Sequence, residues 1–426
     1  MIVPFRATGY PFTPNWLASY PQLCTPFRAT GTPFTANWVP ISRTSGTTLA
    51  VRASVKNLLL FALLTLCSLT SRAQPTDGRP PLWLFGNRAG LDFSAPGPPL
   101  LLEGSSMNTV EGSAVACDPA TGRLLFYTDG QRVWGADHRP MPNGRGLYGS
   151  QNSAQSALVV RRPGQDSLWY VFTTDFQGGN QGLRYSVVST ARRGGLGDVI
   201  EKNTLVFAPV AEKLTAVRHA NGRDVWVVAH RWQSTDYLSV LVTADGVQSP
   251  PVFSSAGTAL VGPGRQAIGY LRASPDGRHL AAALWRDANK FEVLDFDPAT
   301  GAVFGRVTLA PYNRAYGVEF SADGSKLYGT CQDTATNRGV VWQFDLRPGP
   351  DSAPDGQYNN VVGHSAAKEL GALLRGPDGR LYVARHGGRK LAVISTPNAA
   401  GEACGYVDDG VELGKGSSRL GLPNGW

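Results

Sequence analysis

The sequence predicts an all-β fold, a seven-bladed β-propeller, with six or eight blades as the alternatives. The main observation is a repeated phrase made of a polar turn, a short β-type run and a second β-type run. Three copies begin at Ser274, Ser321 and Gly376. Repeats of small hairpins at a period of roughly 40–55 residues are typical of sheets arranged around an axis. The composition agrees, because the chain has 50 Gly and 30 Pro with 42% hydrophobic residues.

Each of the three copies places an Asp-Gly pair between runs rich in β-branched and aromatic residues. The aspartates of these pairs are Asp276, Asp323 and Asp378. Asp-Gly between such runs is the strongest local signal for a hairpin, and a type I′ turn requires positive φ at both central residues. We therefore expect a hairpin with a type I′ turn at each copy.

Three weaker units precede these copies, with turns at 118–122, 162–164 and 221–222. A half-unit around Trp83 opens the array, and the stretch 405–411, which includes Val407, is predicted to close it. Six whole units and one split unit give seven blades. A ring must be closed by N- and C-terminal strands, because otherwise its first and last blades expose unpaired edges. We expect the strand near Trp83 to pair with strands of the last blade.

The length of 426 residues would allow two or three domains, although repeat-built β folds run long as one unit. After the leader no run has the length and 3.6-residue periodicity of an amphipathic helix, so the helix content should be very low. We predict a single propeller domain at 82–426, preceded by a short linker at 74–81.

Six of the eight net positive charges lie in the N-terminal region. Residues 1–73 hold six of the 40 basic residues and no Asp or Glu, which leaves 34 basic against 32 acidic side chains, or +2, for 74–426. A near-neutral body lacks the electrostatic footprint of a polyanion-binding protein. Nucleic acid is therefore excluded as a partner.

Residues 51–73 have the pattern of a secretory signal peptide. Arg52 and Lys56 form a charged start, 58–67 form an apolar stretch, and 71–73 supply a small-x-small cleavage site. The apolar stretch is far shorter than the ~20 residues that span a bilayer, so no transmembrane segment is predicted. We expect export to the periplasm, the outer surface or the extracellular space.

Residues 1–50 contain a near-tandem repeat in which Pro4-Phe5-Arg6-Ala7-Thr8-Gly9 recurs at 26–31. A signal peptide belongs at the terminus of a chain, and here 50 residues precede it. We interpret 1–50 as a non-native upstream extension, with translation beginning at Val51. The alternative is a genuine disordered extension.

Four polar residues in β-type runs are the candidate ligand-binding residues of a central funnel: Glu111, Lys213, His230 and Glu319. A carboxylate in an apolar run must find partners or face water, and the funnel is the water-lined part of a propeller. The structural alternative is hydrogen bonding between blades. If Asn221-Gly222 is a two-residue hairpin, Lys213 faces His230.

The same hairpin would place His219 opposite Asp224, an imidazole held by a carboxylate. Such a pair beside an exposed turn is usually a surface contact. The six histidines are scattered without metal-ligand spacing, so no metal and no cofactor is predicted. We expect the widely spaced Cys117, Cys331 and Cys404 to be mostly buried free thiols.

Several phrases together resemble a family of exported β-propeller proteins from gliding, Bacteroidetes-type bacteria. These phrases lie at 83–93, 125–130, 141–144, 212–222, 316–321 and 420–424. Members look like the propeller of quinoprotein amine dehydrogenase β-chains and often carry modules for type nine secretion. The resemblance implies no established catalytic residues. No sorting tail follows 420–424, which makes periplasmic residence or a truncated gene as plausible as sorting to the outer surface.

The sequence thus favours a non-enzymatic binding or scaffold module of the cell envelope or extracellular space, with an unknown protein or glycan as its ligand. The alternative is a hydrolase on the same fold, lactonase-like or glycan-cleaving, with its active site in the funnel. Fold alone does not choose between them. Acids or histidines converging within ~3–7 Å would favour the enzyme.

Overall fold

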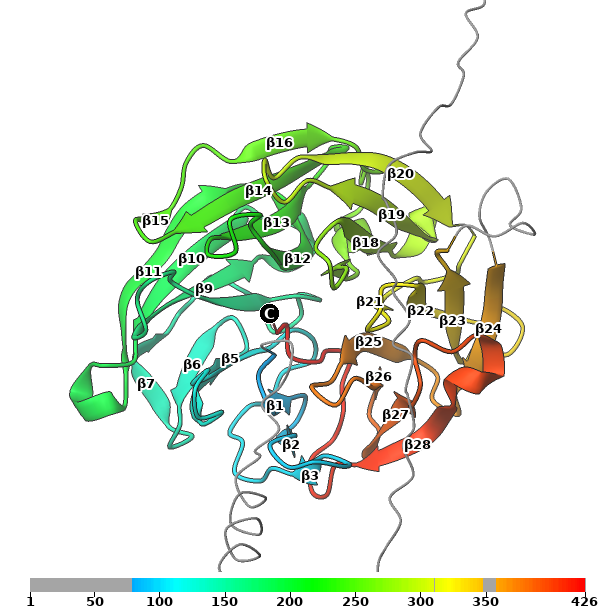
Figure 1. The fold of residues 1–426 in the computed structure, drawn as a ribbon, viewed down its shortest axis with the longest axis horizontal. Coiled ribbons are helices and arrows are strands. Elements are labelled where there is room, and N and C mark those ends of the chain that lie inside the picture. Colours follow the sequence, from blue (N-terminus) through cyan, green and yellow to red (C-terminus); the bar gives the residue numbers. More distant parts are fainter. Residues whose placement is uncertain (1–78, 310, 348–357, 426) are drawn as a thin grey trace, which may run out of the picture. The chain divides into compact units, whose positions relative to one another are not determined.

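The structure, a computed structural model, describes residues 79–309, 311–347 and 358–425. This part of the chain forms seven sheets arranged as blades around an axis (Figure 1). Its 28 strands are accompanied only by five short 3-10 turns, η1 to η5. The predicted seven-bladed, almost helix-free β-propeller is confirmed. The predictions for 1–50, for 51–73 and for most of 74–81 lie outside the described residues.

Each whole blade is an antiparallel sheet built from consecutive strands. The first consists of β4 (Ala114–Cys117), β5 (Leu124–Thr128), β6 (Arg132–Gly135) and β7 (Pro140–Arg145). The second consists of β8 (Ala157–Arg161), β9 (Leu168–Thr174), β10 (Leu183–Ser189) and β11 (Asp198–Phe207). The third consists of β12 (Val210–Arg218), β13 (Val225–Arg231), β14 (Asp236–Thr243), β15 (Gly246–Val247) and β16 (Val252–Ser255).

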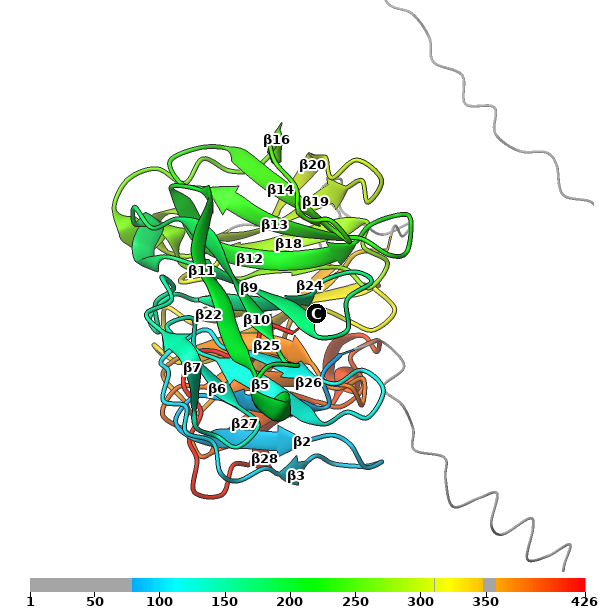
Figure 2. The ribbon, with the colours of Figure 1, turned by 90° about the vertical axis from the view of Figure 1, so that its left-hand side faces the viewer.

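The remaining whole blades follow the same plan. The fourth consists of β17 (Leu271–Ala273), β18 (His279–Leu284), β19 (Lys290–Phe296) and β20 (Val303–Leu309). The fifth consists of β21 (Val318–Phe320), β22 (Lys326–Gln332), β23 (Gly339–Asp345) and β24 (Tyr358–His364). The sixth consists of β25 (Leu370–Arg375), β26 (Leu381–Arg385), β27 (Lys390–Ile394) and β28 (Tyr406–Glu412). Figure 2 shows β12, β13 and β14 side by side in one blade.

The seventh blade holds β1 (Leu82–Phe85), β2 (Ala89–Asp92) and β3 (Leu100–Leu101). The C-terminal chain closes the ring here through a bridge between Asn87 and Ser417, with reciprocal backbone hydrogen bonds of 3.0 Å. Closure by the two chain ends is therefore confirmed. The residues assigned to it were wrong, because the stretch containing Val407 is β28, the outer strand of the sixth blade, and Trp83 lies in a different sheet.

The hairpins at the Asp-Gly pairs are present, but their turns are not type I′. Only the glycines have positive φ, as at Gly277 (69°) and Gly324 (71°), whereas Asp276 and Asp323 do not. Each aspartate instead accepts a hydrogen bond from the backbone N–H two residues on, at 3.0 Å in both turns. This side-chain bond favours an ordinary turn with one left-handed glycine, and the period-2 pattern could not distinguish the two forms.

The blades pack on one another through their inner strands and through aromatic residues. Trp83 packs on Phe93 and Tyr382, and the indole of Trp226 donates to the Pro298 carbonyl of the next blade at 3.0 Å. The three cysteines of the described chain are buried free thiols, as predicted. Within the described ranges no helix is long and apolar enough to cross a membrane.

Candidate functional site

The C-terminal segment closes the middle of the ring. Residues 420–424, here called the plug, run to the centre of the propeller (Figure 1), and its last four residues are buried. The plug is tightly fitted, because a Cβ on Gly421 would lie 1.8 Å from the Glu111 carbonyl oxygen. The Leu420 carbonyl accepts from the N–H of Ala372, and its own N–H donates to Val110. The plug thus bridges the sixth and first blades.

Asn424, the last residue of the plug, ties inner strands of several blades together. Its N–H donates to the Ser113 carbonyl and its Nδ2 to that of Leu214, at 2.6 and 2.9 Å. Its Oδ1 accepts from Arg272 Nη1 at 2.6 Å and from Gln155 Nε2 at 3.3 Å. The asparagine at the end of the plug therefore has a structural role, because its side-chain amide both donates and accepts hydrogen bonds at this position.

One end of the inner strands gathers two carboxyl groups and two tyrosines. This acid end consists of Glu111, Glu212, Tyr270 and Tyr316, all buried. Burial, then the charge of Glu212, raise the pKa of Glu111 well above its usual value, against the Tyr316 hydroxyl beside it. Burial also raises the pKa of Glu212 to about 7, although its carboxylate accepts from the N–H groups of Ala154 and Gln177.

The acid end contains polar atoms without hydrogen bonds of normal geometry to the described residues. They are Oε2 of Glu111 and the hydroxyls of Tyr270 and Tyr316. The arrangement can hold a proton on one of the two carboxyl groups at neutral pH. None of these residues lines the two cavities described below. The acids thus converge where the plug covers them.

Lys213 and His230 lie together between the third and fourth blades. Lys213 Nζ donates to the carbonyls of Ala267 and Ile268 at 3.1 and 2.8 Å. Burial lowers its pKa to about 7. His230 donates through Nδ1 to the Arg231 carbonyl at 2.8 Å, and burial, then the charge of Lys213, lower its pKa to about 4. Both side chains are fully buried, so neither reaches a mouth of the ring.

The register of the third blade follows the predicted sum of 443 along most of β12 and β13, as in Leu214 opposite Ala229. The turn is longer than two residues, because the N–H of His219 donates to the Asp224 carbonyl and that of Gly222 donates back to His219. The proposed His219–Asp224 side-chain pair is not formed. The Asp224 carboxylate accepts from Asn221 and Arg223, and the imidazole lies against Trp226.

Glu319 lies at the other end of the inner strands, among arginines. Its carboxylate is 3.6 Å from Arg272 Nε and 3.7 Å from Arg79 Nη1, and it accepts from the N–H of Arg375 at 3.3 Å. Arg79 Nη1 donates to the Arg375 carbonyl. Arg79, Arg272, Glu319 and Arg375 form the arginine end. Arg218 and Glu212 both lie on β12, six residues or about 20 Å apart along the strand, whereas the Arg272 guanidinium lies 5.2 Å from the ring of Tyr270 in the acid end.

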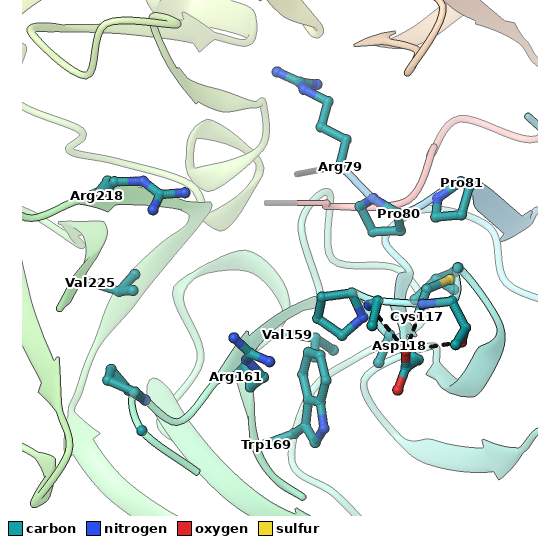
Figure 3. A pocket seen from close by; sticks show the side chains of 18 of the residues that line it. Arg79, Pro80, Pro81, Cys117, Asp118, Val159, Arg161, Trp169, Arg218 and Val225 are labelled. Atoms are coloured by element: carbon teal, nitrogen blue, oxygen red, sulfur yellow. Dashed lines mark hydrogen bonds between the residues drawn. The ribbon is translucent and has the colours of Figure 1, made fainter. Parts of the chain in front are cut away.

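Two adjoining cavities open at the arginine end. The larger, about 580 Å³, is lined by Arg79, Arg161 and Arg218 and by Val159 and Trp169 (Figure 3). The smaller, about 440 Å³, is lined by Arg79, Arg218, Arg272, Glu319 and Arg375. They share Arg79 and Arg218, and we call them together the arginine cavity. Of the four predicted site residues, only Glu319 lines it.

The arginine cavity carries a net positive charge. Its walls hold six arginines, no lysine and three acids, counted over the described residues. Sequence reasoning missed this cluster, although a signal exists. Arg161, Arg218 and Arg375 are each the last residue of an inner strand, namely of β8, β12 and β25. An arginine before the turn of these three units would have indicated a cluster of positive charge on one face.

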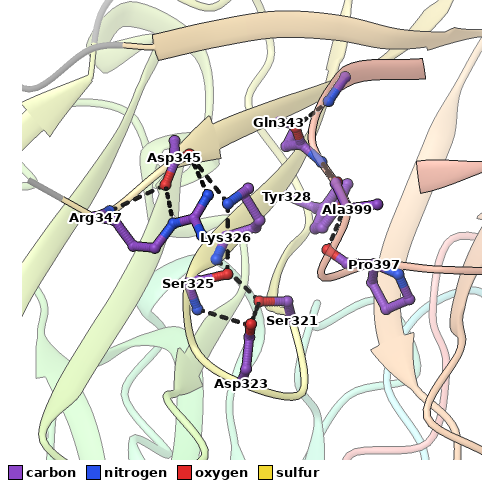
Figure 4. Close-up of polar contacts among 11 residues, drawn as sticks. Ser321, Asp323, Ser325, Lys326, Tyr328, Gln343, Asp345, Arg347, Pro397 and Ala399 are labelled. Atoms are coloured by element: carbon purple, nitrogen blue, oxygen red, sulfur yellow. Dashed lines mark hydrogen bonds and ion pairs between the residues drawn. The ribbon is translucent and has the colours of Figure 1, made fainter. Parts of the chain in front are cut away.

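A second buried lysine, Lys326, is paired with a carboxylate of its own blade. Lys326 Nζ lies 3.0 Å from the Asp345 carboxylate, which Arg347 also holds at 3.0 Å (Figure 4). The Arg347 hydrogen bond, together with Lys326, keeps the pKa of Asp345 well below its usual range. This pair joins β22 to β23 away from the axis. No cluster of three potential metal ligands occurs in the described part of the chain.

Comparison with solved structures finds β-propellers at low similarity. A Lactobacillus plantarum protein shares 13% identity at a TM-score of 0.49, covering 80% of this chain and 98% of that one. The periplasmic gluconolactonase of Pseudomonas aeruginosa shares 18% at 0.35, covering 68% and 93%. Kuenenia stuttgartiensis hydrazine synthase shares 12% at 0.44, covering 71% and 84%.

These values concern the fold and give no information on activity. No protein-family model and no curated protein sequence matches this chain.

Proposed function

We propose that the protein is an exported, non-catalytic binding module of the cell envelope or extracellular space, and that its ligand binds in the arginine cavity. The observation that carries the proposal is the contrast between the two ends of the ring. The arginine cavity is open, with exposed Arg218 and Arg223 among its walls. The converging acids that a hydrolase would use are buried behind the plug.

A rigid ring that presents a cavity at its axis is a common arrangement for ligand recognition. The resemblance of the sequence to exported Bacteroidetes-type propellers supports the proposed location, as does the pattern of a signal peptide at 51–73. A protein or glycan partner at the cavity rim remains part of this proposal.

A funnel hydrolase, lactonase-like or glycan-cleaving, is the second candidate. It is favoured by the acid end, where the raised pKa of Glu111 and Glu212 is what a general acid needs near neutral pH. Such an enzyme requires substrate to reach Glu111, so the plug would have to leave the centre of the ring. Its contacts through Asn424 oppose that movement.

The two functions are separated by one set of measurements on the full-length protein. Thermal unfolding is followed with a panel of neutral glycans, acidic small molecules and peptides, and hydrolysis of lactones and aryl glycosides is assayed in parallel. A binding module gives a ligand-dependent rise in melting temperature and no turnover. Turnover that is lost in both Glu111→Gln and Glu212→Gln would overturn the binding function in favour of the hydrolase.

A further inference from the structure

We propose that the plug is a pH-sensitive closure of the ring. It stays in place while Glu111 or Glu212 keeps a proton, and it detaches from the acid end once both carboxyl groups are ionised and their protons have passed to water. This inference concerns access to the centre of the ring and is independent of ligand binding in the arginine cavity.

The first argument is that the plug lies directly on the residues around Glu111. The N–H of Leu420 donates to the carbonyl of the residue before Glu111 at 2.9 Å, and a Cβ on Gly421 would lie 1.8 Å from the Glu111 carbonyl oxygen. The backbone of Leu422 lies beside the Tyr270 hydroxyl, and the Leu422 side chain is fully buried. Three successive plug residues thus cover the acid end, so water reaches it from this side when the plug moves.

The second argument is that the acid end contains buried polar atoms without hydrogen bonds of normal geometry to the described residues. These atoms are Oε2 of Glu111 and the hydroxyls of Tyr270 and Tyr316, whose rings lie 5.5 Å apart. Burial and the charge of Glu212 both act against an ionised Glu111. Two like charges buried in one group have a high free energy that water lowers, so ionisation of both carboxyl groups favours a state in which water enters.

The charges that face Glu212 from its surroundings do not cancel this repulsion. Asp175, the residue before η1, adds to it. Lys213 opposes it, but burial lowers the pKa of Lys213 to about 7, so this lysine loses its charge at the pH where it would be needed. The Lys213 amine donates to the carbonyls of Ala267 and Ile268, which are not part of the plug.

The third argument is that the other contacts of the plug do not titrate near neutral pH. Asn424 is an amide, and its partner Arg272, which also lies 5.2 Å from the Tyr270 ring, keeps its charge. The Leu420 carbonyl accepts from a backbone N–H, that of Ala372. A response of the plug to pH is therefore assigned to the acid end.

The direction of the response follows from the raised pKa of the two carboxyl groups. Glu212 has a pKa of about 7 when buried, against its usual 4.5. The closed plug is thus fully favoured below pH 4.5, and this advantage is lost as the pH rises from 4.5 to 7. Glu111, whose pKa is raised for the same reason, acts in the same direction.

The test is amide hydrogen exchange of the full-length protein, followed by mass spectrometry of peptides at a series of pH values. The exchange rate of peptide 413–424, divided by the intrinsic rate at each pH, gives the opening equilibrium of the plug. We expect this equilibrium constant to rise at least about tenfold between about pH 5.5 and about pH 8.5. Strand β10 reports unfolding of the whole ring, and its constant should rise by a smaller factor.

Two double variants assign the response to the acid end. Glu111→Gln with Glu212→Gln removes both titrating groups, and the matched control Glu103→Gln with Glu402→Gln removes two exposed carboxyl groups elsewhere. We expect the rise at 413–424 to fall below about twofold in the first variant and to stay near that of the wild type in the control, because an amide cannot ionise.

Two results would overturn the inference. A rise that persists in the Glu111→Gln, Glu212→Gln variant would show that other groups control the plug. Equal changes at 413–424 and in β10 of the wild-type protein would show that the ring opens as a whole and that the plug does not move separately. This second comparison needs no variant, so it decides the matter even where the double variant does not fold.

Discussion

The two ends of the inner strands place buried glutamates in opposite electrostatic surroundings. At the acid end Glu111 and Glu212 lie close to each other, and burial raises the pKa of both, although the charge of Lys213 opposes the rise at Glu212. At the arginine end the carboxylate of Glu319 lies beside two guanidinium groups, that of Arg272 on β17 and that of Arg79 before β1. The same residue type, a buried glutamate near the axis, thus meets a second carboxyl group at one end and arginines at the other.

The two ends also differ in access: the acidic side chains converge at one end, and a ligand can enter at the other. The acid end has the convergence that a reaction needs, and the plug covers it. The arginine end borders an open cavity of about 440 Å³. The following predictions address the contrast, from the largest expected effect to the smallest.

Asn424→Ala should be the most destabilising single change. It removes the amide that receives Arg272 and donates to Leu214, and it leaves the buried Nη1 of Arg272 without its acceptor. We expect the free energy of unfolding to fall by about 4 kcal/mol. Urea unfolding checks this, with the exposed turn residue Asn398→Ala as the matched control, expected to change it by less than about 0.5 kcal/mol. Equal effects would mean that the plug does not hold the ring.

Glu319→Gln should be the next largest. The amide keeps the shape of the side chain but leaves Arg272 and Arg79 without their shared carboxylate. Breaking a buried ion pair by removing one partner costs about 3 kcal/mol. The measurement is again urea unfolding at pH 7, and a neutral effect would show that the arginines do not depend on Glu319.

The pH dependence of stability should report the raised pKa of Glu212 at the acid end. Glu212 holds its proton to a pH of about 7 in the folded protein, against its usual 4.5. The folded state therefore binds more protons between these values, and the free energy of unfolding falls as pH rises from 4.5 to 7. His230, with its pKa lowered to about 4, acts in the opposite direction between 4 and 6.5.

Comparison of Glu212→Gln with the wild type isolates the contribution of the Glu212 carboxyl to the pH dependence of stability, because His230 is present in both proteins. We expect the fall in melting temperature between pH 5 and pH 7 to be smaller in the variant. Identical slopes in the two proteins would contradict a raised pKa at Glu212.

Glu111→Gln should have the smallest effect and the opposite sign to Glu319→Gln. It removes the repulsion between two buried carboxyl groups and keeps the volume of the side chain. We expect the free energy of unfolding at pH 8 to change by less than about 1 kcal/mol or to increase. A loss as large as that of Glu319→Gln would mean that Glu111 is ionised and paired, and would break the contrast between the ends.

The sequence determined the fold class because its signals are local. Turns containing Asp-Gly and alternating β-type runs recur along the chain. Because each blade consists of consecutive strands, the period and order of these runs predicted the number of blades correctly. The turn type was missed because the aspartate side chain can support either form of turn, and only the backbone φ at Asp276 distinguishes them.

The candidate site depended on which end of an inner strand a residue occupies. Glu111 and Glu319 look alike in sequence, as acids within apolar runs, yet one meets a second carboxyl group and the other meets arginines. The partners Glu212, Tyr270 and Tyr316 come from three different blades. Local pattern carries no information on such meetings, because they depend on how blades are placed around the axis.

The sequence by itself therefore determined an all-β, repeat-built ring and the near-neutral charge of its body, since both follow from residue order and composition. Only the tertiary structure decided that the phrase at 420–424 fills the centre of the ring, and that arginines at the ends of separate strands share one cavity. The physical reason is that a propeller brings residues tens to hundreds of positions apart to one axis, where burial and the nearest charges set what each can do.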